Sequence, residues 1–199
     1  MTLKEHIKLI TRAEHWDPFL VLGMHEIESG KKKAIAVRAF LPDADEAWVV
    51  DISDNKTYKM EKTNKAGFFE KNFDDRKELF RYKLRLKASN EHIFEFYDPY
   101  SFWPVLSDFD LYLIGEGSHY KKYEKLGSHI TEINGIKGVH FAVWAPNAKR
   151  VSIVGDFNNW DGRRHQMRVL GSSGIWELFI PGLDEGKIYK FEIKAQSGD

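Results

Sequence analysis

The stretch AVRAFLPDA at residues 36–44 returns as HFAVWAPNA at residues 140–148, and this repetition decides the fold of the chain. The string LGMH, which contains Gly23, precedes the first copy, and LGSH, which contains Gly127, precedes the second. Both pairs of strings keep the same spacing. A fixed period of this kind is typical of a structural unit that occurs twice.

Two further pairs of strings extend the repeat. AGFFEKNF at 66–73 corresponds to SGIWELFI at 173–180, and YKLRLKA at 82–88 corresponds to YKFEIKA at 189–195. These pairs lie three positions further apart than the first two, so the second copy has gained three residues. The gain falls in the segment that includes GDFNNWDGR, residues 155–163.

Within each copy, apolar residues recur at every second position. In YKLRLKA, tyrosine, leucine and alanine alternate with lysine and arginine, which predicts a strand with one face against a core. Pro42 and Pro146 end the preceding strands because proline cannot donate to a ladder. Short strands separated by regular turn signals predict an all-β chain of two tandem immunoglobulin-like antiparallel β-sandwiches.

Thr2 and Glu5 form a capping box ahead of an amphipathic run, so we also predict a short N-terminal helix that packs on the first sandwich. We expect residues 1–104 to be the N-terminal sandwich with this helix, 105–125 an aromatic linker, and 126–199 the second sandwich. The stretch 98–125, which contains this linker, is too aromatic for a flexible tether, and we expect five of its side chains to be buried: Phe102, Trp103, Phe109, Tyr112 and Leu113.

The composition limits the partners of the chain. Lysine plus arginine and aspartate plus glutamate both number 30 in 199 residues, so no overall basic field attracts nucleic acid or an anionic membrane. The longest apolar run near the N-terminus is too short for a signal core or a membrane span. The absence of cysteine excludes disulfides and thiolate sites and is typical of a reducing compartment. We expect a cytoplasmic protein without nucleic acid or membrane partners.

No catalytic or metal-binding pattern is evident, and we expect no catalytic residues, metal or cofactor. The eight histidines occur singly, and no phosphate loop or nucleophile elbow is present. His25 and His129 occupy equivalent repeat positions, which indicates a loop hydrogen bond in each copy rather than a ligand. The basic residues of the 81–87 strand carry no interleaved aromatic residue on their face, which favours a solvated surface over nucleic-acid binding.

The stretch GDFNNWDGR places a tryptophan, Trp160, among residues that favour turns, and Asp161-Gly162 is a tight-turn signal. An indole held at a loop offers a flat face to the C–H groups of a glucose ring. Polar side chains that could then bond sugar hydroxyls are Asp156, Asn158, Asn159 and, from a nearby strand, Lys190. An equally weighted interpretation is that Trp160 covers its own core or packs on another domain.

The second copy, with GVHFAVWAPNAKRVSIVGDFNNWDGRRHQMR, SGIWELFIPG and YKFEI, resembles carbohydrate-binding module family 48 as it occurs in bacterial glycogen branching enzymes. The first copy, through DPFLVLGMH, VRAFLPDA and GFFEKNF, and the linker motifs DPYSFWP and EGSHY resemble the N-terminal part of the same enzymes. The resemblance covers nearly all of residues 14–199. One departure is HQMR at 165–168, where the family usually has HPMR.

The resemblance implies a parent enzyme that cleaves an α-1,4 linkage, holds the chain as a covalent glucosyl-enzyme and transfers it to a 6-hydroxyl. Its two catalytic carboxylates belong to a (β/α)8 barrel that follows this region, so we expect a non-catalytic piece whose partners are α-1,4-glucan or glycogen and the barrel. A related module, in the β subunit of AMP-activated kinase, stacks sugar on a tryptophan that matches Trp160 and uses a lysine that matches Lys190. Its second stacking tryptophan would align beyond Asp199, so we expect an incomplete sugar site and an incomplete C-terminal edge of the second sandwich in this chain. Two alternatives are a purely structural buttress and a stand-alone glycogen-targeting regulatory subunit.

Overall fold

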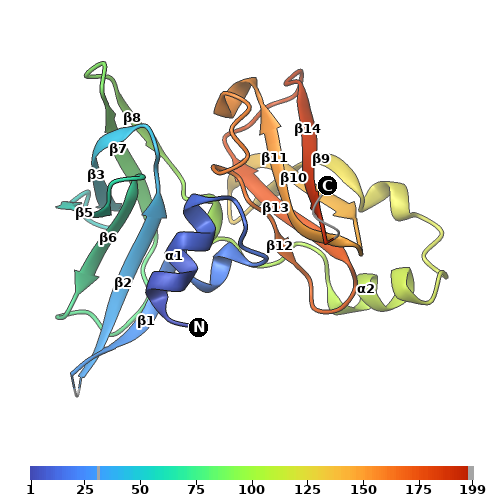
Figure 1. The fold of residues 1–199 in the computed structure, drawn as a ribbon, viewed down its shortest axis with the longest axis horizontal. Helices are drawn as coiled ribbons and strands as arrows, with labels where there is room; N and C mark the ends of the chain where they lie inside the picture. The colour runs from blue at the N-terminus through green and yellow to red at the C-terminus, as the bar shows by residue number, and fades with distance from the viewer. Residues whose placement is uncertain (31, 197–199) are drawn as a thin grey trace. The chain divides into compact units, whose positions relative to one another are not determined.

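The computed structural model describes residues 1–30 and 32–196. The chain forms two compact units (Figure 1). The first unit comprises Met1–Thr11 and Phe19–Ser101, and the second comprises Arg12–Pro18 and Phe102–Asp199. No helix within the described residues is both long enough and apolar enough to cross a bilayer.

The first unit is built from two antiparallel four-stranded sheets, in the orders β1-β2-β6-β5 and β4-β3-β7-β8. Its strands are β1 (Gly23–Ser29), β2 (Lys32–Phe40), β3 (Ala44–Asp51), β4 (Thr57–Lys59), β5 (Glu61–Asn64), β6 (Phe68–Phe73), β7 (Tyr82–Ala88) and β8 (Ile93–Phe96).

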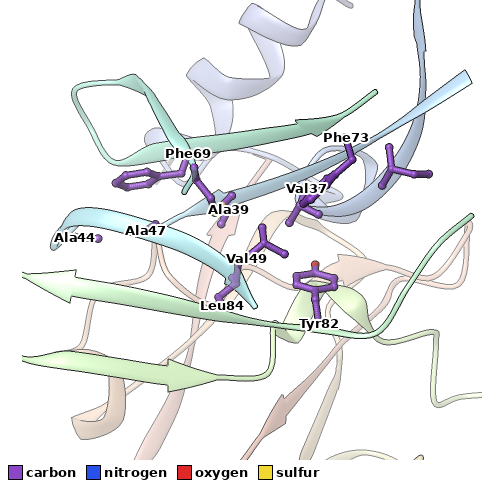
Figure 2. Packing of buried hydrophobic residues seen from close by; sticks show 11 residues of the cluster. Val37, Ala39, Ala44, Ala47, Val49, Phe69, Phe73, Tyr82 and Leu84 are labelled. Atoms are coloured by element: carbon purple, nitrogen blue, oxygen red, sulfur yellow. The ribbon is translucent and has the colours of Figure 1, made fainter. Parts of the chain in front are cut away.

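The core of the first unit lies between these two sheets (Figure 2). Val37 and Phe73 come from one sheet, and Val49, Tyr82 and Leu84 come from the other, and all five side chains are buried in one cluster. Tyr82 and Leu84, which lie on β7, occupy apolar positions of the predicted alternation. The inward-facing residues of both sheets therefore form a sandwich core, as predicted.

The predicted N-terminal helix is α1 (Leu3–Thr11). Its capping box is present, because the backbone N–H of Thr2 donates to the Glu5 carboxylate at 2.7 Å. Ile10 of α1 is fully buried in a cluster with Phe40 and Phe68, which belong to neighbouring strands of the first sheet. The helix thus packs on the first sandwich, and the prediction is confirmed.

The second unit repeats this plan with sheets in the orders β12-β13-β10-β9 and β11-β14. The ring of Phe141 on β10 lies 4.8 Å from that of Tyr189 on β14, which joins the two sheets across the core. The strands are β9 (Gly127–Ile133), β10 (Ile136–Trp144), β11 (Ala148–Gly155), β12 (Arg168–Val169), β13 (Ile175–Pro181) and β14 (Tyr189–Ala195).

The sequence repeat is visible in local geometry. Each copy has a register shift near the start of its third strand, between Ala44 and Glu46 and between Ala148 and Arg150. The ring Nε2 atoms of the two equivalent histidines both lie 3.0 Å from a backbone carbonyl oxygen, that of Leu22 for His25 and that of Leu126 for His129. The predicted loop hydrogen bond is confirmed in both copies. Short 3-10 turns complete the chain: η1 (Pro18–Leu20), η2 (Pro99–Ser101), η3 (Lys122–Glu124) and η4 (Asp156–Asn158).

The linker region differs from its prediction in two ways. It contains a helix, α2 (Asp108–Gly115), with a capping box between Ser107 and Asp110. Leu111 and Ile114 of α2 pack on the outer face of the β10–β13 sheet. Phe102 is buried as expected, and Leu113 is partly buried. The expectation of burial is wrong for Trp103, Phe109 and Tyr112, which are all more than half exposed. Phe109 and Tyr112 lie on α2, and only one side of this eight-residue helix can face the sheet, whereas Trp103 precedes the helix.

Candidate carbohydrate-binding surface

The segment that differs between the copies forms a loop after β11, here called the Trp160 loop and defined as residues 155–166. Its returning limb is hydrogen-bonded to the free edge of β11. The backbone N–H of Ile153 donates to the carbonyl oxygen of His165 at 2.9 Å, and that of Met167 donates to Val151 at 2.9 Å. The loop is therefore anchored at both ends to one strand.

Asn158 braces the loop from inside. It is 1% exposed, its Oδ1 accepts the backbone N–H of Gly155 at 2.9 Å, and its Nδ2 donates to the carbonyl oxygen of Ile153 at 2.8 Å. Nδ2 also lies 2.8 Å from Nδ1 of His165. Burial, together with the charge of Arg164, lowers the pKa of His165 to about 4, so at neutral pH a neutral ring accepts this bond.

The turn at the tip of the loop uses two residues with left-handed backbone, Asn159 at a φ of 57° and Trp160 at 58°. Asparagine tolerates this region, but a tryptophan there is an outlier that costs roughly 1–2 kcal/mol. Two backbone hydrogen bonds stabilise the turn. The N–H of Trp160 donates to the carbonyl oxygen of Gly155 at 3.0 Å, and the N–H of Asp161 donates to the carbonyl oxygen of Asn158 at 3.2 Å. Such strain persists only where the surroundings impose it, and it is concentrated at functional positions.

The indole of Trp160 is oriented by a hydrogen bond from the N–H group at its edge. Its Nε1–H donates to Oδ1 of Asp156 at 2.8 Å, and 42% of the residue remains exposed. Asp156 and Asn159 are exposed beside it in the same loop. One side chain thus orients the ring, while a large part of its surface stays open to solvent.

The predicted turn at Asp161 is present, since the N–H of Arg164 donates to the carbonyl oxygen of Asp161 at 3.1 Å. Gly162 is needed in this turn because it has no side chain, and not because the backbone is left-handed there. A Cβ on Gly162 would lie 2.1 Å from Oε1 of Glu192, so the loop passes directly over that carboxylate. The same Oε1 accepts from Arg150 at 2.6 Å.

Arg163 also stabilises the turn at Asp161, because its guanidinium donates to the Asp161 carboxylate at 2.7 and 2.9 Å. Burial opposes ionisation of Asp161, but the Arg163 hydrogen bonds prevail and hold its pKa below the usual value.

Lys190 is exposed on β14, where it pairs with Val154, next to the residue at which the Trp160 loop begins. Paired residues point to the same face of an antiparallel ladder, and so do residues two apart on one strand. Lys190 therefore shares a face with Glu192, the residue over which the loop passes. The structure brings Trp160, Asp156 and Asn159 together at the loop surface, sets Lys190 at the same end of the β11–β14 pair, and withdraws Asn158 into the interior.

Sequence reasoning missed the supporting residues Glu192, Arg150 and Arg163. The first had a signal, since it lies two residues after Lys190 on the same strand face. Among residues 1–30 and 32–196 there is no group of three histidine, aspartate or glutamate side chains arranged to hold a metal ion. The surface offers an anchored aromatic ring with hydrogen-bonding neighbours.

Comparison with known proteins identifies both units. Residues 3–100 match the N-terminal domain of the alpha-1,4-glucan branching enzyme GlgB, and residues 125–199 match carbohydrate-binding module 48, the isoamylase N-terminal domain. A 1,4-alpha-glucan branching enzyme GlgB of Nostoc sp. is 50% identical over 195 residues, and that of Trichodesmium erythraeum is 48% identical. Each alignment covers 98% of this chain and 25% of the relative, so the chain spans about a quarter of the length of these relatives.

Among solved structures, the chain is similar to a pullulanase complexed with maltotriose from Anoxybacillus sp. LM18-11, with 12% identity and a TM-score of 0.28. That alignment covers 87% of this chain and 23% of the pullulanase. The two matched domains follow one another along the chain, and the alignments to the branching-enzyme relatives span both of them. The chain belongs to the family of GlgB N-terminal regions, with a GlgB N-terminal domain followed by a carbohydrate-binding module 48.

Proposed function

We propose that this chain is a non-catalytic α-glucan-binding region, and that the Trp160 loop of the second unit is its binding surface. The observation that carries the proposal is the indole of Trp160. It stands on strained left-handed backbone, its Nε1–H is bonded to Asp156, and 42% of the residue remains exposed. A protein that needed only a turn here would be more stable with glycine at this position.

The chemistry of the surface suits a neutral sugar. The C–H groups on one side of a glucose ring carry weak positive charge and favour the negative face of an indole. Asp156 keeps acceptor capacity after binding the indole, Asn159 offers an exposed amide, and Lys190 adds a donor at the same end of the sheet. Asn158 acts as a positioning residue, since its amide is already used inside the loop.

The role that we propose for the region is supported by its relatives, which are named 1,4-alpha-glucan branching enzymes. We propose that the parent protein transfers α-1,4-glucan segments to 6-hydroxyls in the cytoplasm, and that a (β/α)8 barrel outside this chain performs that chemistry. Weak binding by an attached module raises the effective concentration of a polymeric substrate at the barrel. These relatives favour that role over a stand-alone regulatory subunit.

Affinity electrophoresis tests glucan binding directly. The 199-residue chain should migrate more slowly in a native gel that contains glycogen than in a plain gel, and Trp160→Ala should lose most of this retardation. Trp103→Ala is the matched control, because Trp103 is 82% exposed in the same unit and lies outside the Trp160 loop. Equal mobility of the unaltered chain in both gels would contradict glucan binding and leave the structural buttress.

A further inference from the structure

The second unit has a hollow of about 390 Å³ at the opposite end of β11 from the Trp160 loop. Ala148, the first residue of β11, lines this hollow, whereas the Trp160 loop begins at Gly155, the last residue of the strand. At ~3.3 Å per residue, the strand separates the two places by roughly 20 Å or more. The hollow is therefore distinct from the surface described above.

One wall of the hollow is Trp16, from the 12–18 segment that belongs to the second unit. Its indole stacks on the ring of His15, with centroids 4.7 Å apart and planes at 17°. His15 is fully buried, and its Nδ1 accepts the backbone N–H of Asp17 at 3.0 Å. One face of the indole is thus covered by a fixed ring, yet Trp16 as a whole remains 41% exposed.

The 12–18 segment is tied to the strands beside the hollow. Nε of Arg150 on β11 donates to the carbonyl oxygen of Ala13 at 2.8 Å, and Nζ of Lys194 on β14 lies 2.8 Å from the Glu14 carboxylate. Arg150 is buried, so its bond is shielded from water. These contacts hold Trp16 in place before any ligand arrives.

The rest of the hollow combines apolar and polar groups. Trp176 is 2% exposed, and its Nε1–H is used by the carbonyl oxygen of Ala145 at 3.0 Å, so its ring is a rigid part of the wall. Lys149, Ser172 and Gln196 supply exposed donors and acceptors. No carboxylate lines the hollow as the structure describes it, and one lysine is too little for a polyanion. An open aromatic wall with scattered neutral polar groups suits an uncharged, hydroxyl-rich ring.

We infer that this hollow is a second α-glucan subsite, in which a glucose unit of an α-1,4-linked chain stacks on Trp16 and bonds the polar groups around it. The inference rests on the proposed function, since it takes the ligand class from the Trp160 loop. The volume lies within the ~300–1,000 Å³ typical of small-molecule sites. Two weak sites on one rigid unit, roughly 20 Å apart, hold a long polymer more tightly than either holds a short chain.

The test uses the indole N–H signals in a two-dimensional ¹⁵N spectrum of the 199-residue chain. The six tryptophans give one signal each, assigned by single Trp→Phe substitutions. On titration with maltoheptaose, the Trp16 signal should move in a saturable way and should do so equally in the Trp160→Ala variant. The signal of Trp103, which lies in neither site, should stay in place and is the internal control.

Ser172→Leu tests the location without removing Trp16. Ser172 is exposed, so a branched apolar side chain there should fill the hollow and abolish the shift of the Trp16 signal, while the Trp160 signal still responds. A Trp160 signal that moves while Trp16 stays still would overturn the second subsite and leave the proposed function intact. A Trp16 shift that survives in Ser172→Leu also overturns it. A Trp16 shift without a Trp160 shift supports the subsite and contradicts the Trp160 surface.

Discussion

Asn158 and Asn159 are neighbours of the same residue type with opposite physical roles. Asn158 is buried, and its side-chain amide forms the hydrogen bonds of the Gly155 N–H and of the Ile153 carbonyl oxygen. Asn159 is exposed, and what the turn needs from it is tolerance of a φ of 57°. Position in the loop, rather than side-chain chemistry, therefore decides which of the two is essential for stability.

This difference predicts unequal effects of substitution. Asn158→Ala should lower the free energy of unfolding of the second unit by about 2–3 kcal/mol, because a buried N–H and a buried C=O lose their partners. Asn159→Gly should change it by less than about 0.5 kcal/mol, because glycine adopts the left-handed region freely. Urea unfolding measures both changes when it is followed by the fluorine signal of 5-fluorotryptophan at Trp176, which is buried in this unit. Equal losses in the two variants would contradict the assigned roles.

The sequence revealed the candidate loop but not its internal geometry. Residue types alone marked Trp160 as an aromatic side chain in a turn, and repeat alignment showed that the segment differs between copies. The bond from Trp160 to Asp156 and the withdrawal of Asn158 depend on the path of the backbone. The turn-forming pairs Asn158-Asn159 and Asp161-Gly162 on either side of Trp160 permit several such paths, so composition could not choose between them.

Among the structural elements, α2 and the segment before it depend on a single buried carboxylate. Glu177 on β13 is fully buried and accepts from the backbone N–H groups of Val105 and Leu106, each at 3.1 Å. Nη2 of Arg168 lies 2.9 Å from it, and Nε2 of His140 lies 3.1 Å away. Burial raises the pKa of Glu177, but the His140 bond and the Arg168 charge outweigh burial and lower it overall.

Removing this charge should loosen the whole segment. Glu177→Gln removes the carboxylate that is bonded to the largely buried Arg168, and we expect a loss of about 3 kcal/mol or more in the stability of the second unit. Hydrogen exchange at the Val105 and Leu106 amides should also accelerate. Glu132→Gln, an exposed change in the same unit, is the control. Unchanged exchange at both amides would show that the carboxylate does not hold the segment.

The strands were predictable because a period of two leaves a clear trace, as in YKLRLKA and YKFEIKA. Helix α2 was missed because apolar side chains occupy nearly every position, including Phe109, Leu111 and Tyr112, and so give no helical stripe. Its one usable signal was Ser107 with Asp110 three residues later, which is the capping box that the structure contains.

At the scale of the whole molecule, each unit has its own core, and a buried acid in the first unit gives that unit its own pH response. Asp98 is 1% exposed and accepts the Tyr82 hydroxyl at 2.6 Å and the Tyr100 N–H at 2.9 Å. Burial exceeds the effect of these bonds and raises the pKa of Asp98 from 3.8 to about 6. The folded first unit therefore binds this proton more tightly than the unfolded chain does.

The sign of the resulting pH dependence follows from this raised pKa. The contribution of Asp98 to stability is fully present below the unfolded pKa of 3.8 and is lost as the pH rises through about 6. A difference of this size corresponds to about 3 kcal/mol. Between pH 3.5 and 6.5 (roughly the window between the two pKa values), the unfolding free energy of the first unit relative to an Asp98→Asn variant should fall by about that amount.

Fluorine signals from 5-fluorotryptophan distinguish the units, because Trp48 lies on β3 of the first and Trp176 on β13 of the second. Asp98→Asn should change the pH dependence of urea unfolding reported by Trp48 and leave that reported by Trp176 as it was. Asp74→Asn, an exposed change in the first unit, is the matched control. If Asp98→Asn alters both signals alike, the two units unfold as one cooperative block, and a pH response confined to the first unit is excluded.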